Sequence, residues 1–319
     1  MASSPPPKTS PEQHIPLAAD AEPGPNWPAA KQLWGIAWEF HWAGFGVLFG
    51  ILAVRSFIAL AQVRTRQGFS RKPLYIATNA LLLMLGTTRA LLMFLDPYSS
   101  GDNGVKLPNW FARLLYGITF PCLTSSFCLI HLAFCEVAKV QIGPKKIHSV
   151  RFVISVIITH FALEITAAVA IAVRPHLVPL MIVCQSFFIL WGFLLSAGFI
   201  YSGLKVIHRA RRAQRQIGTI ELRDAATAKA NGARRKERTS KVAKVTFVTS
   251  ILGFVSCALQ IYSMFGVYGL YSRAVNPSPW PWWVFQTCSR LVEFCMACTI
   301  AFSVMQRSEQ QINNRSDNK

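Results

Sequence analysis

The sequence has little charge for its length, and most of the charge it has is of one sign. Charged residues make up 15% of the 319 positions, and 33 Lys and Arg outnumber 14 Asp and Glu to give a net charge of +19. A nucleic-acid-binding protein presents its positive charge as one basic face, but these basic residues lie in separate segments between apolar runs. We therefore expect no nucleic-acid partner.

The motifs of metal and redox chemistry are also scarce. No HxxxH or HExxH pattern occurs, and His41, His131 and His160 lie in three different apolar runs. The CxxC pair Cys295 and Cys298 has no second pair and lies inside an apolar run, where core packing is the simpler role. We expect no metal site, no cofactor and no enzymatic activity. All eight cysteines lie within apolar runs, which excludes a disulfide framework outside the membrane.

Long apolar runs, in contrast, are abundant. Seven of them contain about 22 to 31 residues each, enough to cross a hydrocarbon core about 30 Å thick at a rise of 1.5 Å per residue. They lie at 34–62, 74–95, 109–138, 150–173, 177–207, 245–270 and 282–305. The sequence therefore predicts an all-α integral membrane protein with seven transmembrane helices.

The distribution of basic residues predicts the orientation of these helices. Most Lys and Arg lie between runs one and two, three and four, and five and six, and after run seven, whereas the alternate segments hold only Lys8, Lys31, Lys106, Arg174 and Arg273. Because basic loops stay in the cytoplasm, we expect the N-terminus outside and the C-terminus inside. Eight of the nine tryptophans lie toward the expected outer boundary, which favours the same orientation. We favour the plasma membrane over internal membranes.

Three regions follow from this topology. Residues 1–33 form a proline-rich extracellular tail that we expect to be disordered, because eight prolines fall in its first 28 residues. We expect no cleavable signal peptide in it, because no short apolar core with a cleavage site precedes Trp34. Residues 34–306 form the membrane domain, including a basic cytoplasmic loop at 208–244. Residues 307–319 form a short cytoplasmic tail.

Six charged residues interrupt the apolar runs in the expected outer half, and an unpaired charge at such a depth is costly. Three cations match three carboxylates in number, so we expect them to balance one another. They are Glu39, Arg89, Arg113, Glu164, Arg290 and Glu293. Glu39 shares a helix face with a stripe of small residues, Ala43, Gly46, Gly50 and Ala53. Such a stripe is of the type that packs helix on helix, so we expect Glu39 to face the bundle.

Arg89 has two interpretations that the sequence leaves open. In the first, Arg89 is a structural ion-pair partner of a carboxylate on a neighbouring helix, and we expect Glu293 or Glu39 in that role before Glu164. In the second, the charged residues line a water-accessible outer cavity that binds an anionic or zwitterionic ligand or couples to protons.

Two further features carry predictions. Pro121 should kink the third helix, because a proline removes one backbone hydrogen bond and its ring clashes with the preceding turn. The 208–244 loop is either a solvated basic loop or a contact for anionic lipid or a cytoplasmic protein. Phosphorylation at Thr239 or Ser240 would weaken either contact. The basic residues that we single out in this loop are Arg209, Arg211, Arg212, Arg215, Arg234, Arg235, Lys236 and Arg238.

The segments "WGIAWEFHWAGFGVLFG", "TTRALLMFLDPY" and "FARLLYGITFPCLTSSF" resemble the membrane domain of the proline-rich transmembrane protein 3 and 4 family. The resemblance implies a multi-pass membrane protein without an established biochemical role. This chain has about 33 residues before its first run where that family carries a long proline-rich region, so the resemblance implies no partner binding through that region here. The marks of rhodopsin-like receptors, Asp-Arg-Tyr and Asn-Pro-x-x-Tyr, are missing at the ends of runs three and seven.

We expect a non-enzymatic function. The first hypothesis is a receptor-like or membrane-organising protein that acts through an outer polar cavity and a basic cytoplasmic loop, with the lipid bilayer as its surroundings. The alternative is a secondary transporter or proton-coupled carrier that uses Arg89, Glu164 and Glu293. Many transporters contain internal repeats, and the seven runs show none.

Overall fold

The computed structural model describes residues 24–63, 72–102, 104–137, 150–174, 177, 179–218, 245, 247–268 and 276–316, and the regular structure within them is helical. Seven stretches are long and apolar enough to cross a membrane. The first two are α2 (Ile36–Gln62) and α3 (Lys72–Leu95), and the third consists of α4 (Asn109–Gly117) and α5 (Thr119–Val137). The others are α6 (Val150–Val173), α7 (Pro179–Gly218), a sixth span at Phe247–Val267 and α9 (Pro279–Ser316).

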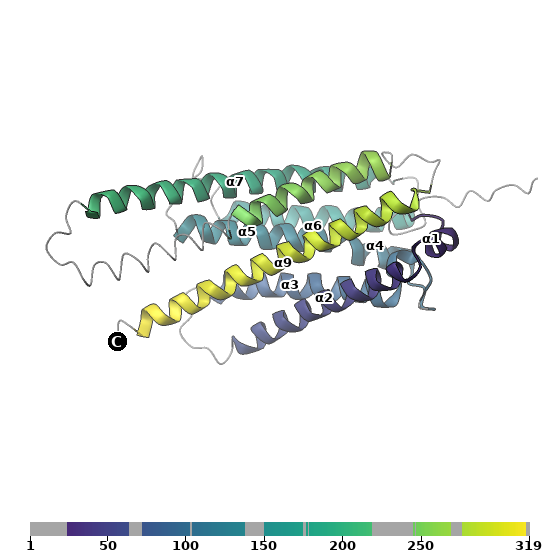
Figure 1. Cartoon of the computed structure of the whole chain (residues 1–319), viewed down its shortest axis with the longest axis horizontal. Coiled ribbons are helices and arrows are strands. Elements are labelled where there is room, and N and C mark those ends of the chain that lie inside the picture. The colour runs from purple at the N-terminus through teal and green to yellow at the C-terminus, as the bar shows by residue number, and fades with distance from the viewer. Residues whose placement is uncertain are drawn as a thin grey trace, which may run out of the picture.

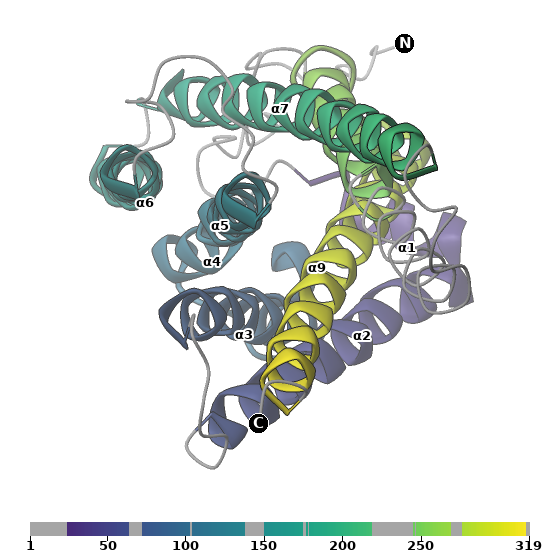
Figure 2. The same ribbon diagram turned by 90° about the vertical axis from the view of Figure 1, so that its left-hand side faces the viewer.

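The spans lie side by side in one bundle, and the short helix α1 (Trp27–Trp34) lies at one end of it (Figure 1). We call this end the tryptophan end, because Trp27, Trp34, Trp38 and Trp282 pack together there. Viewed along the bundle, α5 is surrounded by α3, α6, α7 and α9 (Figure 2), all of which contact it. The third span is accordingly the most buried, with 72% of its most apolar stretch covered, against 22–44% for the other six.

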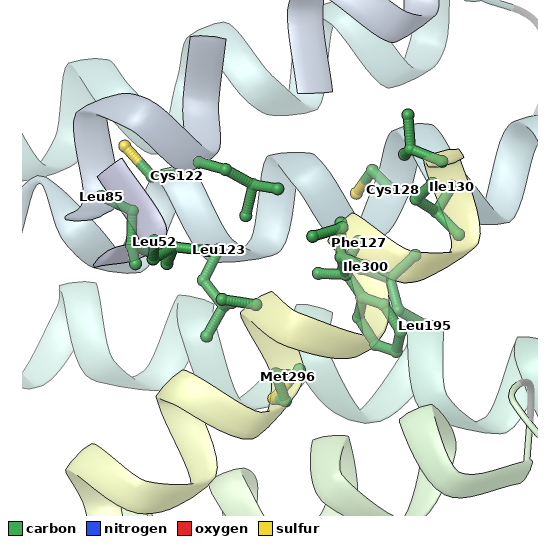
Figure 3. Close-up of a cluster of buried hydrophobic side chains, with 14 of the residues drawn as sticks. Leu52, Leu85, Cys122, Leu123, Phe127, Cys128, Ile130, Leu195, Met296 and Ile300 are labelled. Atoms are coloured by element: carbon green, nitrogen blue, oxygen red, sulfur yellow. The ribbon is translucent and has the colours of Figure 1, made fainter. Parts of the chain in front are cut away.

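The main apolar core lies around α5. Side chains from six helices meet there, and Figure 3 shows Leu52 of α2, Leu85 of α3, Phe127 of α5, Leu195 of α7 and Ile300 of α9 among them. Because lipid is as apolar as these side chains, close packing holds such a bundle together better than hydrophobic exclusion does. The exposed apolar residues of the other spans face outward, as a lipid environment requires.

The closest approach between two helix backbones at a described glycine lies at Gly86 of α3, which meets the Ala53 end of the small-residue stripe on α2. A Cβ atom at Gly86 of α3 would come within 2.8 Å of the Phe49 carbonyl oxygen and the Ala53 nitrogen of α2, so the two backbones touch only because residue 86 is glycine. Gly46 instead lies under the ring of Phe94, and Gly50 has open space around it. The stripe on α2 therefore meets the α3 backbone at Ala53 and the Phe94 side chain at Gly46, and it has open space at Gly50.

Two breaks separate consecutive helices. Gly35, at a φ of 50°, separates α1 from α2. Because α1 begins at Trp27, residues 27–33 are helical and do not belong to the disordered tail that the sequence predicts at 1–33. The third span breaks between Gly117 and Thr119. Pro121 explains this position, because its missing N–H is the α-helical donor for the Gly117 carbonyl and its ring crowds that carbonyl.

Two helices continue past the ends of their predicted runs. α7 extends to Gly218, and Figure 1 shows it projecting beyond the rest of the bundle. Arg209, Arg211, Arg212 and Arg215 therefore belong to a helix and not to a loop that begins at 208. α9 extends to Ser316, so the predicted tail at 307–319 is largely helical. The predicted sites Arg234, Arg235, Lys236, Arg238, Thr239 and Ser240 lie outside the described residues, as do residues 1–23.

Candidate functional site

The centre of the site is an ion network between α3 and α9. Arg89 donates from Nε to both carboxylate oxygens of Glu293, at 2.9 and 3.2 Å. Arg290, one turn from Glu293 on α9, donates from Nη1 to the same carboxylate. Arg89 and Arg290 are 0% and 1% exposed, so one buried carboxylate holds two buried guanidinium groups.

Tyr116 of α4 joins this network to a third helix. Its hydroxyl accepts a hydrogen bond from Arg290 Nη2 at 3.4 Å, and its ring lies 4.9 Å from the guanidinium carbon of Arg89 and 5.4 Å from that of Arg290. The faces of aromatic rings attract cations, so Tyr116 stabilises both guanidinium groups without adding charge. Phe120 offers Arg89 a second ring at 5.8 Å.

Gln286 extends the network toward the sixth span. It accepts a hydrogen bond from Arg290 Nη2 at 3.3 Å and donates to the hydroxyl of Tyr268 at 3.1 Å. Tyr268 follows the π-helical turn η3 (Ser263–Val267) that ends the sixth span, and its backbone N–H bonds to the Ser263 carbonyl. We call Arg89, Tyr116, Tyr268, Gln286, Arg290 and Glu293 the ion network from here on.

The ion network is electrostatically incomplete. Its two cations and one carboxylate leave one positive charge, contrary to the predicted balance. Nη1 and Nη2 of Arg89 are buried and have no hydrogen-bond partner among the described residues. Leaving a buried donor unsatisfied costs about 1–3 kcal/mol, and more for a charged group. The ion network thus retains donors that a further acceptor would satisfy.

A cavity adjoins the ion network and shares two of its residues. Tyr116 and Tyr268 line it, as do Arg113 of α4 and Glu164 of α6. The space open to the centres of water-sized molecules is about 50 Å³, enough for roughly three to five waters when each needs about 10–15 Å³. The remaining walls are mainly apolar, and the rings of Phe120 and Phe188 meet there at 5.2 Å.

Glu164 lies against the break in the third span. Its Oε2 atom is 2.8 Å from the place where a Cβ of Gly117 would be, so the carboxyl group fits there because residue 117 is glycine. No hydrogen bond or ion pair to this carboxyl occurs within the described part of the chain. Arg113 is 6% exposed, and its Nη1 donates to the sulfur of Met181 at 3.2 Å.

The prediction that Glu39 faces the bundle is wrong. Glu39 is exposed and accepts a hydrogen bond from Trp42 Nε1 at 2.9 Å. It does lie on the same helix face as Gly46, but Phe94 covers that face only at Gly46. Since α3 ends at Leu95, it provides no cover for Glu39, which lies two turns nearer the tryptophan end.

The structure therefore sorts the six predicted charged residues into three groups. Arg89, Arg290 and Glu293 meet in the ion network, Arg113 and Glu164 line the cavity, and Glu39 stands apart.

A second polar cluster ties α1 to the segment after α3. Lys31 of α1 pairs with Asp102, which also accepts hydrogen bonds from Trp38 Nε1 at 2.6 Å and from Ser100 Oγ at 2.8 Å. Partial burial would raise the pKa of Asp102, but the hydrogen bonds from Lys31, Ser100 and Trp38 outweigh it and hold the pKa below its usual value. Sequence reasoning missed this cluster, because nothing in the spacing of residues 31 and 102 indicates a contact.

Asp96 organises the same segment from inside. It is fully buried, and its carboxylate accepts hydrogen bonds from the backbone N–H groups of Gly101 at 3.4 Å and Leu107 at 3.2 Å. The next residues form the turn η1 (Pro97–Ser99), in which Tyr98 has a φ of 55°. This conformation is costly for a bulky residue, and the hydrogen bond between the Tyr98 hydroxyl and His41, at 3.0 Å, helps to hold it.

Seven apolar spans around a buried ion network define the chain as a multi-pass membrane protein. Comparison with known proteins agrees: the pattern of the proline-rich transmembrane protein 3 domain matches residues 10–318. The chain belongs to the proline-rich transmembrane protein 3 and 4 family.

Two relatives give the extent of the similarity. Proline-rich transmembrane protein 4 of Mus musculus is 30% identical over 282 residues, and that of Homo sapiens is 29% identical over 282 residues. Each match covers 86% of this chain and 30% of the relative, so the chain spans less than a third of their length. No solved structure matches the chain.

Proposed function

We propose that this chain is a receptor-like, non-enzymatic membrane protein in which occupation of the cavity rearranges the helices through the ion network. Tyr116 carries the proposal, because it lines the cavity and also contacts Arg89 and Arg290. A ligand that displaces Tyr116 must disturb the cations that hold Glu293. Since Arg89 lies on α3 and Glu293 on α9, the disturbance reaches two further spans.

The proposal includes an orientation and an output. The tryptophan end faces outside, in accordance with the excess of Lys and Arg in the segments at the opposite end. The basic residues from Arg209 onward then lie in the cytoplasm, at the plasma membrane, where they contact anionic lipid or a cytoplasmic protein.

A distance measurement between the ends of the helices opposite the tryptophan end tests the coupling. Spin labels at Ala61→Cys on α2 and Phe247→Cys on the sixth span, with the exposed Cys288 and Cys298 replaced by serine, report that distance by electron resonance. We expect Glu293→Gln to shift the distance distribution in lipid nanodiscs. The matched control is Glu39→Gln, a carboxylate outside the ion network, which should leave the distribution unchanged. Identical distributions for the Glu293 variant and the parent would refute the coupling.

The second candidate function is a proton-coupled carrier, and the Glu164 carboxyl favours it, because no ion pair to this group occurs in the described part of the chain. Proteoliposomes with an internal pH-sensitive dye and an imposed membrane potential decide between the two. The receptor-like function predicts no proton flux above that of empty liposomes. Flux that Glu164→Gln abolishes would establish the carrier instead.

A further inference from the structure

We infer that the cavity is a binding site for a small zwitterion, with its ammonium group on Glu164, its acidic group on Arg113 and an apolar segment between them. This inference deepens the proposed function and rests on it, because it names the class of ligand that the same cavity receives. It depends on three observations: the acceptors at one end of the cavity, the donor at the other, and the space between them.

The inner end of the cavity is rich in acceptors. The Glu164 carboxyl lies against Gly117, and it has no hydrogen bond or ion pair within the described residues. The Gly117 carbonyl loses its α-helical donor, because residue 121 is proline and has no N–H. An ammonium group has three donors and no acceptor, and it carries the opposite charge to the carboxylate. It therefore suits this wall better than a neutral or anionic group.

The other end of the cavity carries a fixed cation. Arg113 lies four residues after Asn109, the first residue of α4, and Glu164 lies nine residues before Val173, the last residue of α6. Both helix ends lie at the tryptophan end, so at 1.5 Å per residue the Cα atom of Glu164 lies about 7 Å deeper than that of Arg113. Arg113 would repel a simple amine that passes it, but its guanidinium group matches a carboxylate or phosphate.

The space between the two charges limits the size of the ligand. A cavity for roughly three to five waters, each with a share of about 30 Å³ of liquid volume, accommodates on the order of six to eight non-hydrogen atoms. Two apolar lining residues, Ala167 and Ala168 of α6, lie at depths between those of Arg113 and Glu164 by the same helical rise. A short chain of methylenes with an amine at one end and a carboxylate at the other meets the charge, the length and the apolar wall together.

Ligand-detected nuclear magnetic resonance on the full chain in nanodiscs tests the site, with 5-aminopentanoate as the probe. Pentylamine lacks the acidic group and pentanoate lacks the amine, so we expect each to bind about tenfold or more weakly than 5-aminopentanoate. Glu164→Gln should weaken the binding of 5-aminopentanoate and of pentylamine but not the binding of pentanoate. Arg113→Gln should weaken the binding of 5-aminopentanoate and pentanoate but not that of pentylamine, which the Arg113 charge repels.

Two more variants distinguish a specific loss of the binding site from misfolding of the protein. Gly117→Ala keeps the Glu164 charge but places a Cβ 2.8 Å from its Oε2, so it should also weaken both amines. Glu39→Gln should change no affinity, because Glu39 lies away from the cavity. Absence of binding by 5-aminopentanoate, or equal binding by wild type and Glu164→Gln, would overturn the inference. The distance shift expected for Glu293→Gln needs no ligand, so a failure of this site and a failure of the coupling are separate results.

Discussion

Replacing Glu293 with Gln should destabilise the bundle far more than replacing Arg89 with Met, although the two residues form one ion pair. The reason is that Glu293 is shared. It accepts hydrogen bonds from both Arg89 and Arg290, so Glu293→Gln leaves two buried cations together without a counter-charge. After Arg89→Met, the Arg290–Glu293 pair remains, and the site becomes neutral.

The magnitudes follow from these two outcomes. Removing one partner of a buried ion pair costs about 3–5 kcal/mol, because the other charge stays buried without compensation. We expect Glu293→Gln to cost at least this much. Arg89→Met loses the two contacts from Nε and the ring contacts with Tyr116 and Phe120. It also removes the unsatisfied Nη1 and Nη2, each of which costs about 1–3 kcal/mol. The losses and gains offset one another, so we expect a change within about 2 kcal/mol of wild type in either direction.

The cysteines provide the assay. Cys122, Cys128, Cys135, Cys184 and Cys257 are buried thiols, so a thiol-reactive fluorophore reports unfolding in detergent as they become accessible on heating. The full cycle comprises Arg89→Met, Glu293→Gln and the double variant, and contacting residues in such a cycle show coupling of about 0.5–3 kcal/mol. Glu39→Gln is the matched control for loss of a carboxylate.

Two results would refute this reasoning. Equal losses for Arg89→Met and Glu293→Gln would mean that the contacts of Arg89 with Glu293, Tyr116 and Phe120 outweigh the gain from removing its unsatisfied donors. Strictly additive losses of stability in the double variant would mean that the two side chains do not interact, contrary to the distance of 2.9 Å between Arg89 Nε and Glu293 Oε1.

Three further predictions concern residues outside the ion network. Glu39→Gln should change the free energy of unfolding by no more than a typical exposed substitution does, about 0.5 kcal/mol. A larger loss of stability in thermal unfolding would mean that Glu39 has a buried partner. Gly86→Ala should destabilise the protein by more than 1 kcal/mol through overpacking, whereas Gly50→Ala should be tolerated, and equal midpoints would contradict the close helix contact. Because the folded-state pKa of Asp102 is lowered, its contribution to stability is present above the unfolded-state pKa near 3.9 and is lost as the pH falls through the folded-state value. Asp102→Asn should remove this part of the acid dependence in thermal scans between pH 3 and pH 6, and an unchanged dependence would exclude the pairing with Lys31 as its source.

The sequence predicts the spans well because one physical requirement, an apolar length that matches the bilayer, determines them. Val150–Val173 has the bounds predicted from its apolar run. The ends of α7 and α9 depend instead on helix propensity outside the membrane, where apolarity gives no signal, and both helices run further than predicted. The break at Ile118 lies where the proline rule places it, next to the carbonyl that Pro121 leaves without an α-helical donor.

The candidate site was harder to predict, because it depends on which helices are neighbours. Periodicity shows that Arg290 and Glu293 share a face of α9, and their pairing follows from spacing alone. From the sequence, the partner of Arg89 could have been Glu293 or Glu39. The structure excludes Glu39, because α3 ends at Leu95 and does not reach the level of Glu39 on α2. Gly117 and Gly86 act by making room for atoms of other helices, and a single sequence carries no signal for such contacts.

The length of α7 sets how far its basic end lies from the apolar stretch of the helix. Its transmembrane stretch ends at Lys205, and the helix continues for 13 residues to Gly218, which at 1.5 Å per residue is a rod about 20 Å long beyond the apolar stretch. The Debye length at physiological salt is about 8 Å, so the backbone at Arg215, about 15 Å along this rod, lies nearly two Debye lengths from the point where the rod begins. If the rod stands upright, the backbone at Arg215 lies beyond most of the electrostatic reach of the apolar boundary. Under the proposed function, this length favours a cytoplasmic protein over anionic lipid as the contact of this end of α7.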